Sequence, residues 1–203
     1  MAVKGCGCTV PFVRWEELFA DLTAEFEALE SAELAAEVTD RTRREMARIR
    51  LVDRLRAAET RAVAVSLPAL NGAQTISGRL LDVGPDWMLV GPAEATVEVL
   101  IPLVAVGSVI GLPSDAAEPG SEGQVRARLG LAHVLRGIAR DRAAVCLATR
   151  GGPTLTGTID RVGADYLDLA EHAPDEPRRA GSVQAERTVP FTAILFVQRA
   201  VAG

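Results

Sequence analysis

Cysteine, histidine, lysine and aromatic residues are all scarce in this sequence. It holds three cysteines and two histidines, and only 4% of its residues are aromatic. Cys6 and Cys8 lie in a Gly-rich stretch and Cys146 in an apolar run, so we expect no disulfide framework. This fits a protein of the reducing cytoplasm. A structural zinc site needs more ligands at workable spacing, and His133 and His172 are far from the cysteine pair. We therefore expect no bound metal and no cofactor.

Long apolar runs are also missing. No stretch reaches the roughly 18 uninterrupted apolar residues of a membrane span, and the Gly-rich start lacks the pattern of a signal peptide. The net charge of -5 excludes a generic polyanion binder. Apart from Lys4, every basic residue is arginine, which together with abundant Ala, Gly and Val indicates a GC-rich bacterial genome. These features predict a cytoplasmic bacterial protein that does not bind membranes.

What the sequence does contain is a repeat. Thr75 to Val90 reads TISGRLLDVGPDWMLV, and Thr154 to Leu169 reads TLTGTIDRVGADYLDL, with five identities in sixteen positions. A second pair of similar segments follows the two copies, IPLVAVGSV from Ile101 and VPFTAILFV from Val189. Ordered self-similarity of this kind indicates a duplicated fold unit. Its shared structural positions are Gly78, Gly84, Asp86 and Pro102 in the first copy and Gly157, Gly163, Asp165 and Pro190 in the second.

The N-terminal part is predicted to be helical. Residues 1–12 are expected to form a disordered tail and residues 13–49 a helical region. Apolar residues recur there every three or four positions: Trp15, Leu18, Phe19, Leu22, Phe26 and Leu29. Thr39 and Asp40 suggest a cap, so we expect two helices with a turn near Val38 to Asp40. A single helix of more than 40 residues is the alternative.

Each repeat reads as a helix followed by five short strands. The first covers residues 50–112 and the second residues 125–203, with a linker of Pro, Gly and Ser residues at 113–124 between them. Gly78 and Gly157 lie inside predicted strands, where glycine marks a bend or a close backbone approach. The second repeat contains a polar insert at residues 170–188, which we expect to be a mobile hairpin or loop.

A helix, five short strands and a glycine-bent second strand resemble the Sm-like barrel of the Lsm and Hfq proteins. The pattern also resembles uncharacterised actinobacterial proteins with a helical N-terminus and tandem Sm-like repeats. The resemblance implies an α+β fold, with an N-terminal helical region and two small five-stranded barrels. The asparagine with which Sm proteins hold a base is absent from both copies. Ile101-Pro102 and Val189-Pro190 replace the family's second motif, so its RNA-binding residues are not expected here.

Charge is segregated along the helical region. Residues 14–39 hold eight acidic residues and only Arg14 as a base, whereas residues 40–61 hold eight arginines and four acids. One interpretation is an Arg-rich helix that contacts nucleic acid or an acidic partner. The other is an acidic helix packed against a basic one, within the chain or across a dimer. The residues concerned are Arg41, Arg43, Arg44, Arg48, Arg50, Arg54 and Arg56.

No catalytic constellation is evident in the sequence. Asp86 and Asp165 recur at the same turn and could bind a cation, but aspartates commonly cap such turns by accepting from local amides, which is the role we expect. His133 is expected to be packed on an apolar helix. We therefore predict a non-enzymatic binding or assembly module with a protein partner or a second copy, and with no evident small-molecule substrate. Open sheet edges are the expected contact surfaces, and a nucleic-acid-binding regulator is the alternative.

Overall fold

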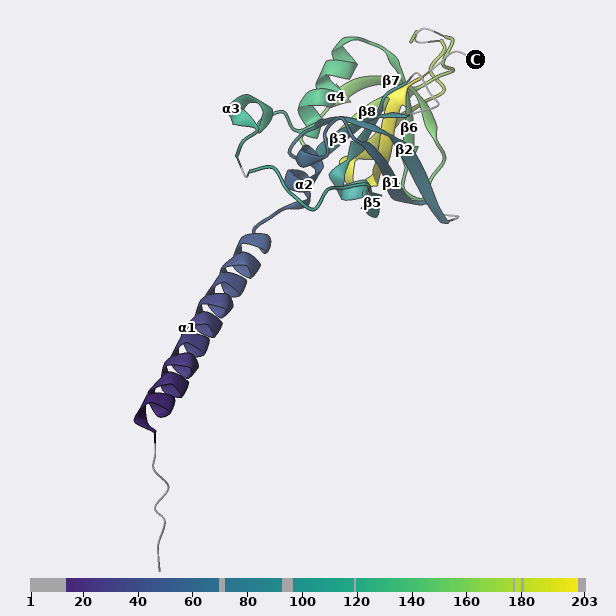
Figure 1. The fold of residues 1–203 in the computed structure, drawn as a ribbon. Coiled ribbons are helices and arrows are strands. Elements are labelled where there is room, and N and C mark those ends of the chain that lie inside the picture. Colours follow the sequence, from purple (N-terminus) through teal and green to yellow (C-terminus); the bar gives the residue numbers. More distant parts are fainter. Residues whose placement is uncertain are drawn as a thin grey trace, which may run out of the picture. The chain divides into compact units, whose positions relative to one another are not determined.

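The N-terminal unit is a single helix. The computed structural model describes residues 14–69, 72–92, 97–118, 120–176, 178–179 and 181–200, which form two units, residues 14–48 and residues from Ile49 onward. The predicted tail at residues 1–12 lies outside this range. Helix α1 spans Trp15–Met46 without interruption (Figure 1). The predicted turn near Val38 is wrong because the Thr39 hydroxyl donates to the Ala35 carbonyl, 2.7 Å away, within the continuing helix.

The second unit alternates short helices with strands. Its first half comprises α2 (Leu51–Ala57), β1 (Ala62–Ala69), β2 (Gly72–Val83), β3 (Trp87–Pro92), β4 (Val99–Pro102), the 3-10 turn η1 (Leu103–Ala105) and β5 (Ser108–Ile110). After α3 (Gly123–Arg126), the second half comprises α4 (Leu131–Arg140), β6 (Ala144–Thr149), β7 (Leu155–Val162), β8 (Tyr166–Glu171), β9 (Ala185–Pro190), the 3-10 turn η2 (Phe191–Ala193) and β10 (Ile194–Arg199).

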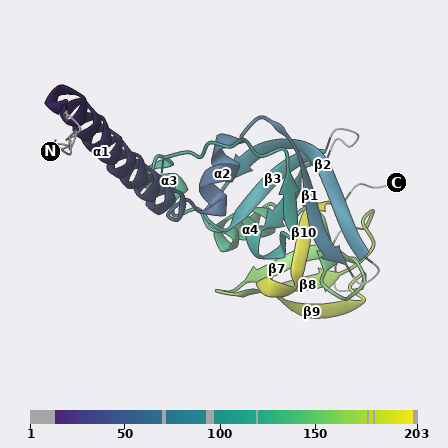
Figure 2. The same cartoon turned by 60° about the horizontal axis from the view of Figure 1, so that its bottom comes forward.

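The strands form one antiparallel sheet instead of two barrels. Their order is β5-β1-β2-β3-β4-β10-β6-β7-β8-β9. To close a barrel, β4 would have to pair with β5. The three-residue β5 pairs only with β1 among the described strands, and β4 pairs with β10, Leu100 opposite Val197. The prediction of two five-stranded barrels is therefore wrong, and β10 joins the two halves (Figure 2).

Both halves contain the same pairing pattern. Gly78 lies opposite Pro92 and Gly157 opposite Glu171, and a register shift follows two residues later in each strand. The turns match as well. The Gly84 amide donates to the Trp87 carbonyl at 2.9 Å, and the corresponding bond from Gly163 to Tyr166 is 2.8 Å. Pro102 and Pro190 lie opposite these aromatic residues on the neighbouring strands.

Gly157 is required because two strands approach closely there. A Cβ atom at this position would overlap the carbonyl oxygen of Ala170 on β8, and backbone cannot move aside as a flexible side chain can. At Gly84 and Gly163 a Cβ atom would instead overlap the ring of Trp87 or Tyr166. Gly157 therefore makes room for the adjacent strand, and Gly84 and Gly163 make room for an aromatic ring.

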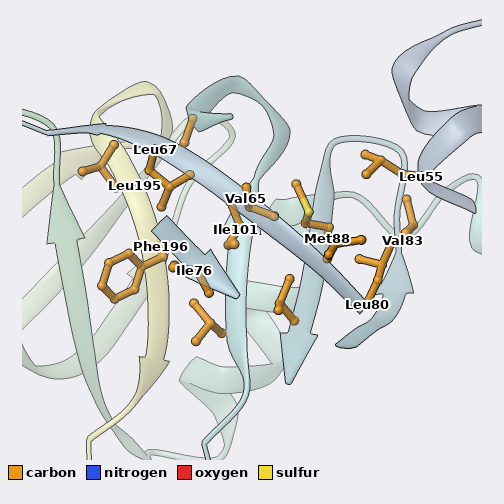
Figure 3. Packing of buried hydrophobic residues seen from close by; sticks show 14 of the residues in the cluster. Leu55, Val65, Leu67, Ile76, Leu80, Val83, Met88, Ile101, Leu195 and Phe196 are labelled. Atoms are coloured by element: carbon orange, nitrogen blue, oxygen red, sulfur yellow. The ribbon is translucent and has the colours of Figure 1, made fainter. Parts of the chain in front are cut away.

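Two clusters of buried apolar residues lie in the sheet unit, one for each half. The first includes Leu55, Val65 and Leu80, but it also contains Leu195 and Phe196 from β10 (Figure 3). The second surrounds residues such as Leu135 and Ile159, and it contains Trp87 and Leu100 from the first half. Each half thus supplies side chains to the core of the other.

Asp86 connects the two halves by capping a helix. Its carboxylate accepts a hydrogen bond from the backbone amide of Leu131, the first residue of α4, at 2.8 Å. The Trp87 indole donates to the carbonyl of Leu129 at 2.6 Å. Asp86 was predicted to cap its own turn, and this is wrong because a helix N-terminus from a distant segment provides the donor. Asp165 is exposed, and its side chain makes no hydrogen bond with the described residues.

We expect Gly157→Ala to lower the free energy of unfolding by about 1–3 kcal/mol, because the added methyl group forces β7 and β8 apart. Gly137→Ala is the matched control. Gly137 lies inside α4 with open space around it, so alanine should stabilise the protein there by roughly 0.5–1 kcal/mol. Urea unfolding curves check both values. Equal midpoints for the two variants would contradict the close-approach argument.

We expect Asp86→Ala to cost about 1 kcal/mol of stability because the first turn of α4 loses its acceptor. The repeat provides the control, since Asp165→Ala removes the same group from the same turn of the second half. That change should stay within about 0.5 kcal/mol. Thermal melts of the two variants at one pH make the comparison, and losses of equal size would refute the capping role.

Candidate interaction surfaces

Helix α1 carries a stripe of large apolar residues. The stripe consists of Trp15, Leu18, Phe19, Leu22, Phe26 and Leu29, which fall within about 100° of the helix circumference. All six are exposed, Trp15 by 65% and Phe26 by 69%. The rings of Trp15 and Phe19 lie side by side with centroids 6.4 Å apart. An apolar stripe of this size in water is typical of a surface that binds another protein.

The charges on α1 separate along its length. From Trp15 to Glu37 the helix has acidic residues and no arginine or lysine, and its last turns contain Arg41, Arg43 and Arg44. Arg41 pairs with Glu45 at 3.1 Å and Arg44 with Asp40 at 2.5 Å, both within the helix. These are exposed i,i+4 pairs, each worth about 0.3–0.5 kcal/mol. Two of the three arginines on α1 are therefore paired with carboxylates of the same helix.

The predicted arginine cluster is divided between two structural roles. Arg43 and Arg48 are exposed, and their side chains form no ion pair with the described residues. Arg50, Arg54 and Arg56 belong to the sheet unit. Arg54 donates to the Pro113 carbonyl at 2.7 Å, and the side chain of Arg56 is only 6% exposed. The structure thus does not bring the seven predicted arginines together on one surface.

Arg56 lies between two carboxylates. It is 3.0 Å from Glu122 and 3.6 Å from the fully buried Asp53, which also accepts the backbone amide of Arg50 at 3.0 Å. The Asp53 carbonyl in turn accepts the amide of Ala117 at 3.0 Å. The predicted linker at 113–124 is therefore bound against α2.

The acid dependence of this contact follows from Glu122. A hydrogen bond from its own backbone and the nearby charges of Arg56 and Arg50 lower the pKa of Glu122, against the opposing effect of burial. A carboxyl with a lowered pKa stabilises the fold above its unfolded pKa, and the contribution is lost as the pH falls through the folded value. The linker contact is thus expected to weaken in acid.

The two edges of the sheet are β5 and β9, and neither resembles the internal β4–β10 junction. At that junction β4 presents Val99 and Leu100, both buried. The corresponding positions on β9 are Arg187 and Thr188, both exposed, and Arg187 pairs with Glu171 at 2.5 Å. Polar and charged side chains of this kind prevent further strand pairing in natural sheets. The β9 edge is therefore poorly suited to the assembly contact predicted from the sequence.

The β5 edge is more apolar but very short. Ile110 is 72% exposed, and the corresponding residue of the second half is Gln198 on β10. Leu81 on β2 corresponds to Asp160 on β7. A groove of about 780 Å³ lies beside them, lined mainly by small residues of β1 and β2. With only three residues, Ser108–Ile110, β5 offers few main-chain groups to a partner strand.

Two polar side chains that could perform chemistry, His172 and Asp160, have structural partners. His172 is buried, with Nε2 2.8 Å from the Thr158 hydroxyl and Nδ1 2.7 Å from the Ala173 carbonyl. Asp160 on β7 pairs with Arg178 of the 170–188 insert at 2.6 Å. This ion pair and the contact between Thr158 and His172 tie the insert to β7. His133 is exposed on α4 and was wrongly predicted to be packed. Among the residues described, no group of three metal-ligating side chains occurs.

Comparisons with protein-family models, with curated proteins and with solved structures found no match. Within the described ranges, no helix is long and apolar enough to cross a membrane. The surfaces above are therefore the basis on which a function can be argued.

We expect Arg56→Met to lower stability by about 3 kcal/mol, because Glu122 loses its ion-pair partner and the buried Asp53 keeps only the largely exposed Arg50 as a cation. Arg48→Gln is the control, since this exposed side chain has no ion pair in the described part of the chain and its loss should change stability by less than about 0.5 kcal/mol. Chemical denaturation of both variants measures the difference. If the two substitutions had equal effects, Arg56 would not be a structural residue.

Proposed function

We propose that this chain is a non-enzymatic binding module that docks a helix of another polypeptide on α1. The supporting observation is the apolar stripe from Trp15 to Leu29, whose six large side chains are all exposed. Burying one such side chain contributes about 1.5–3 kcal/mol, so even partial coverage of six provides substantial binding free energy. Aromatic residues such as Trp15 are also enriched among the residues that dominate protein interfaces.

The geometry of the stripe favours a helical partner. Trp15, Phe19, Leu22, Phe26 and Leu29 follow a 4-3-4-3 spacing, the pattern that lets side chains of two helices interlock. The stripe covers 15 residues, or about 22 Å of helix axis. A straight seam of that length matches about four turns of a second helix.

The nucleic-acid alternative has less support. Of the seven candidate arginines, Arg54 and Arg56 are held in the sheet unit, and Arg41, Arg44 and Arg50 pair with carboxylates. Phosphate binding needs cations that are free to replace the counterions of the nucleic acid. The α1 stripe, in contrast, has large apolar side chains facing solvent.

Site-specific crosslinking in cells that produce the protein tests this proposal. Benzoylphenylalanine placed at Leu22, in the middle of the stripe, should give one or a few discrete covalent adducts. The control places it at Leu34, which is 64% exposed but lies about 120° around the helix from Leu22. Adducts should appear at position 22 and be absent or weak at position 34.

Two further results determine the interpretation. Adding Phe26→Glu, which places a charge in the seam, should remove the adducts at position 22. An adduct of twice the mass of the chain would identify a second copy as the partner. The proposal fails if positions 22 and 34 give the same adducts, or if position 22 gives none.

A further inference from the structure

The flanks of the α1 stripe are acidic on both sides. By helical geometry Glu25 borders one edge of the stripe and Glu30 the other, and Asp21 and Glu16 lie beyond them. No arginine or lysine occurs between Trp15 and Asp40 to offset these charges. Side chains at such flanking positions determine which partner and which orientation a helix accepts.

A second copy of α1 is a poor occupant of this surface. Two stripes set face to face, in either direction, bring the acidic flanks of both copies together, and like charges at these positions are destabilising. A copy shifted along the axis does no better. Beyond Leu29 the same face of the helix is occupied by Glu33, Asp40 and Arg44. A shifted copy would therefore place its large apolar side chains against these charged residues.

We infer that the partner is an amphipathic helix of another protein, with an apolar face of about four turns and lysine or arginine on its flanks. This rests on the proposed function, because it specifies the occupant of the same stripe. The apolar faces supply most of the affinity. The charges select the partner, since a basic flank meets Glu25 and Glu30 where an acidic flank is repelled.

Two synthetic helical peptides test the inference with the full-length chain. Both have the same leucine seam at 4-3-4-3 spacing, and they differ only in flanks of lysine or of glutamate. Fluorescence anisotropy of the labelled peptides measures Kd. At low salt the lysine peptide should bind at least about tenfold more tightly than the glutamate peptide, and the ratio should shrink as salt screens the flanks.

Substitutions in the chain provide matched controls. Glu25→Gln and Glu30→Gln should each weaken binding of the lysine peptide by about 1.7- to 2.3-fold, in line with about 0.3–0.5 kcal/mol for one exposed pair. Glu27→Gln removes the same charge about 130° around α1 from the middle of the stripe and should leave Kd nearly unchanged. Circular dichroism of each variant verifies that the helix is intact.

The outcomes separate the inference from the proposal beneath it. If both peptides bind equally, the charge inference is overturned and helix docking stands. If neither binds and sedimentation shows a monomer, helix docking itself is refuted. If the chain self-associates through the stripe and excludes both peptides, a second copy is the occupant and the inference is overturned.

Discussion

Strand β10 is buried on both of its faces, and the rest of the sheet depends on this. Ile194 and Val197 lie in the second apolar cluster, whereas Leu195 and Phe196 lie in the first. Because Trp87 and Leu100 enter the second cluster from the first half, neither half can exclude water from its core without the other. The β4–β10 pairing is thus where the two halves join into one sheet with a shared core.

The two halves share a pairing pattern but differ where one of them faces solvent. Asp86 caps α4, but the side chain of the corresponding Asp165 makes no hydrogen bond with the described residues. Leu100 is buried at the internal junction, whereas Thr188 is exposed on the β9 edge. Conserving the backbone pattern while exchanging apolar for polar side chains keeps both halves folded. It also limits further growth of the sheet at β9.

Helix α1 differs from the sheet unit in the exposure of its large apolar residues. In the sheet unit the large apolar residues are mostly buried, but on α1 the six residues of the stripe are exposed. Its 32 residues are long enough for a helix to form with local support from pairs such as Arg41–Glu45. The combination of an apolar seam and acidic flanks has little value for the stability of an isolated helix. We therefore propose α1 as the binding surface.

The sequence by itself determined the local elements. Apolar spacing predicted the first part of α1 and its stripe, although not that the helix continues past Val38 to Met46. The repeat with its glycines located most of the strands, because these depend on interactions between near neighbours. Tertiary structure decided the rest. Whether β4 pairs with β5 or with β10, whether Asp86 caps its own turn or a helix 45 residues away, and whether Arg56 faces solvent or Asp53 depend on long-range contacts. Such contacts are chosen by the burial of side chains that are distant in sequence, and local periodicity contains no information about them.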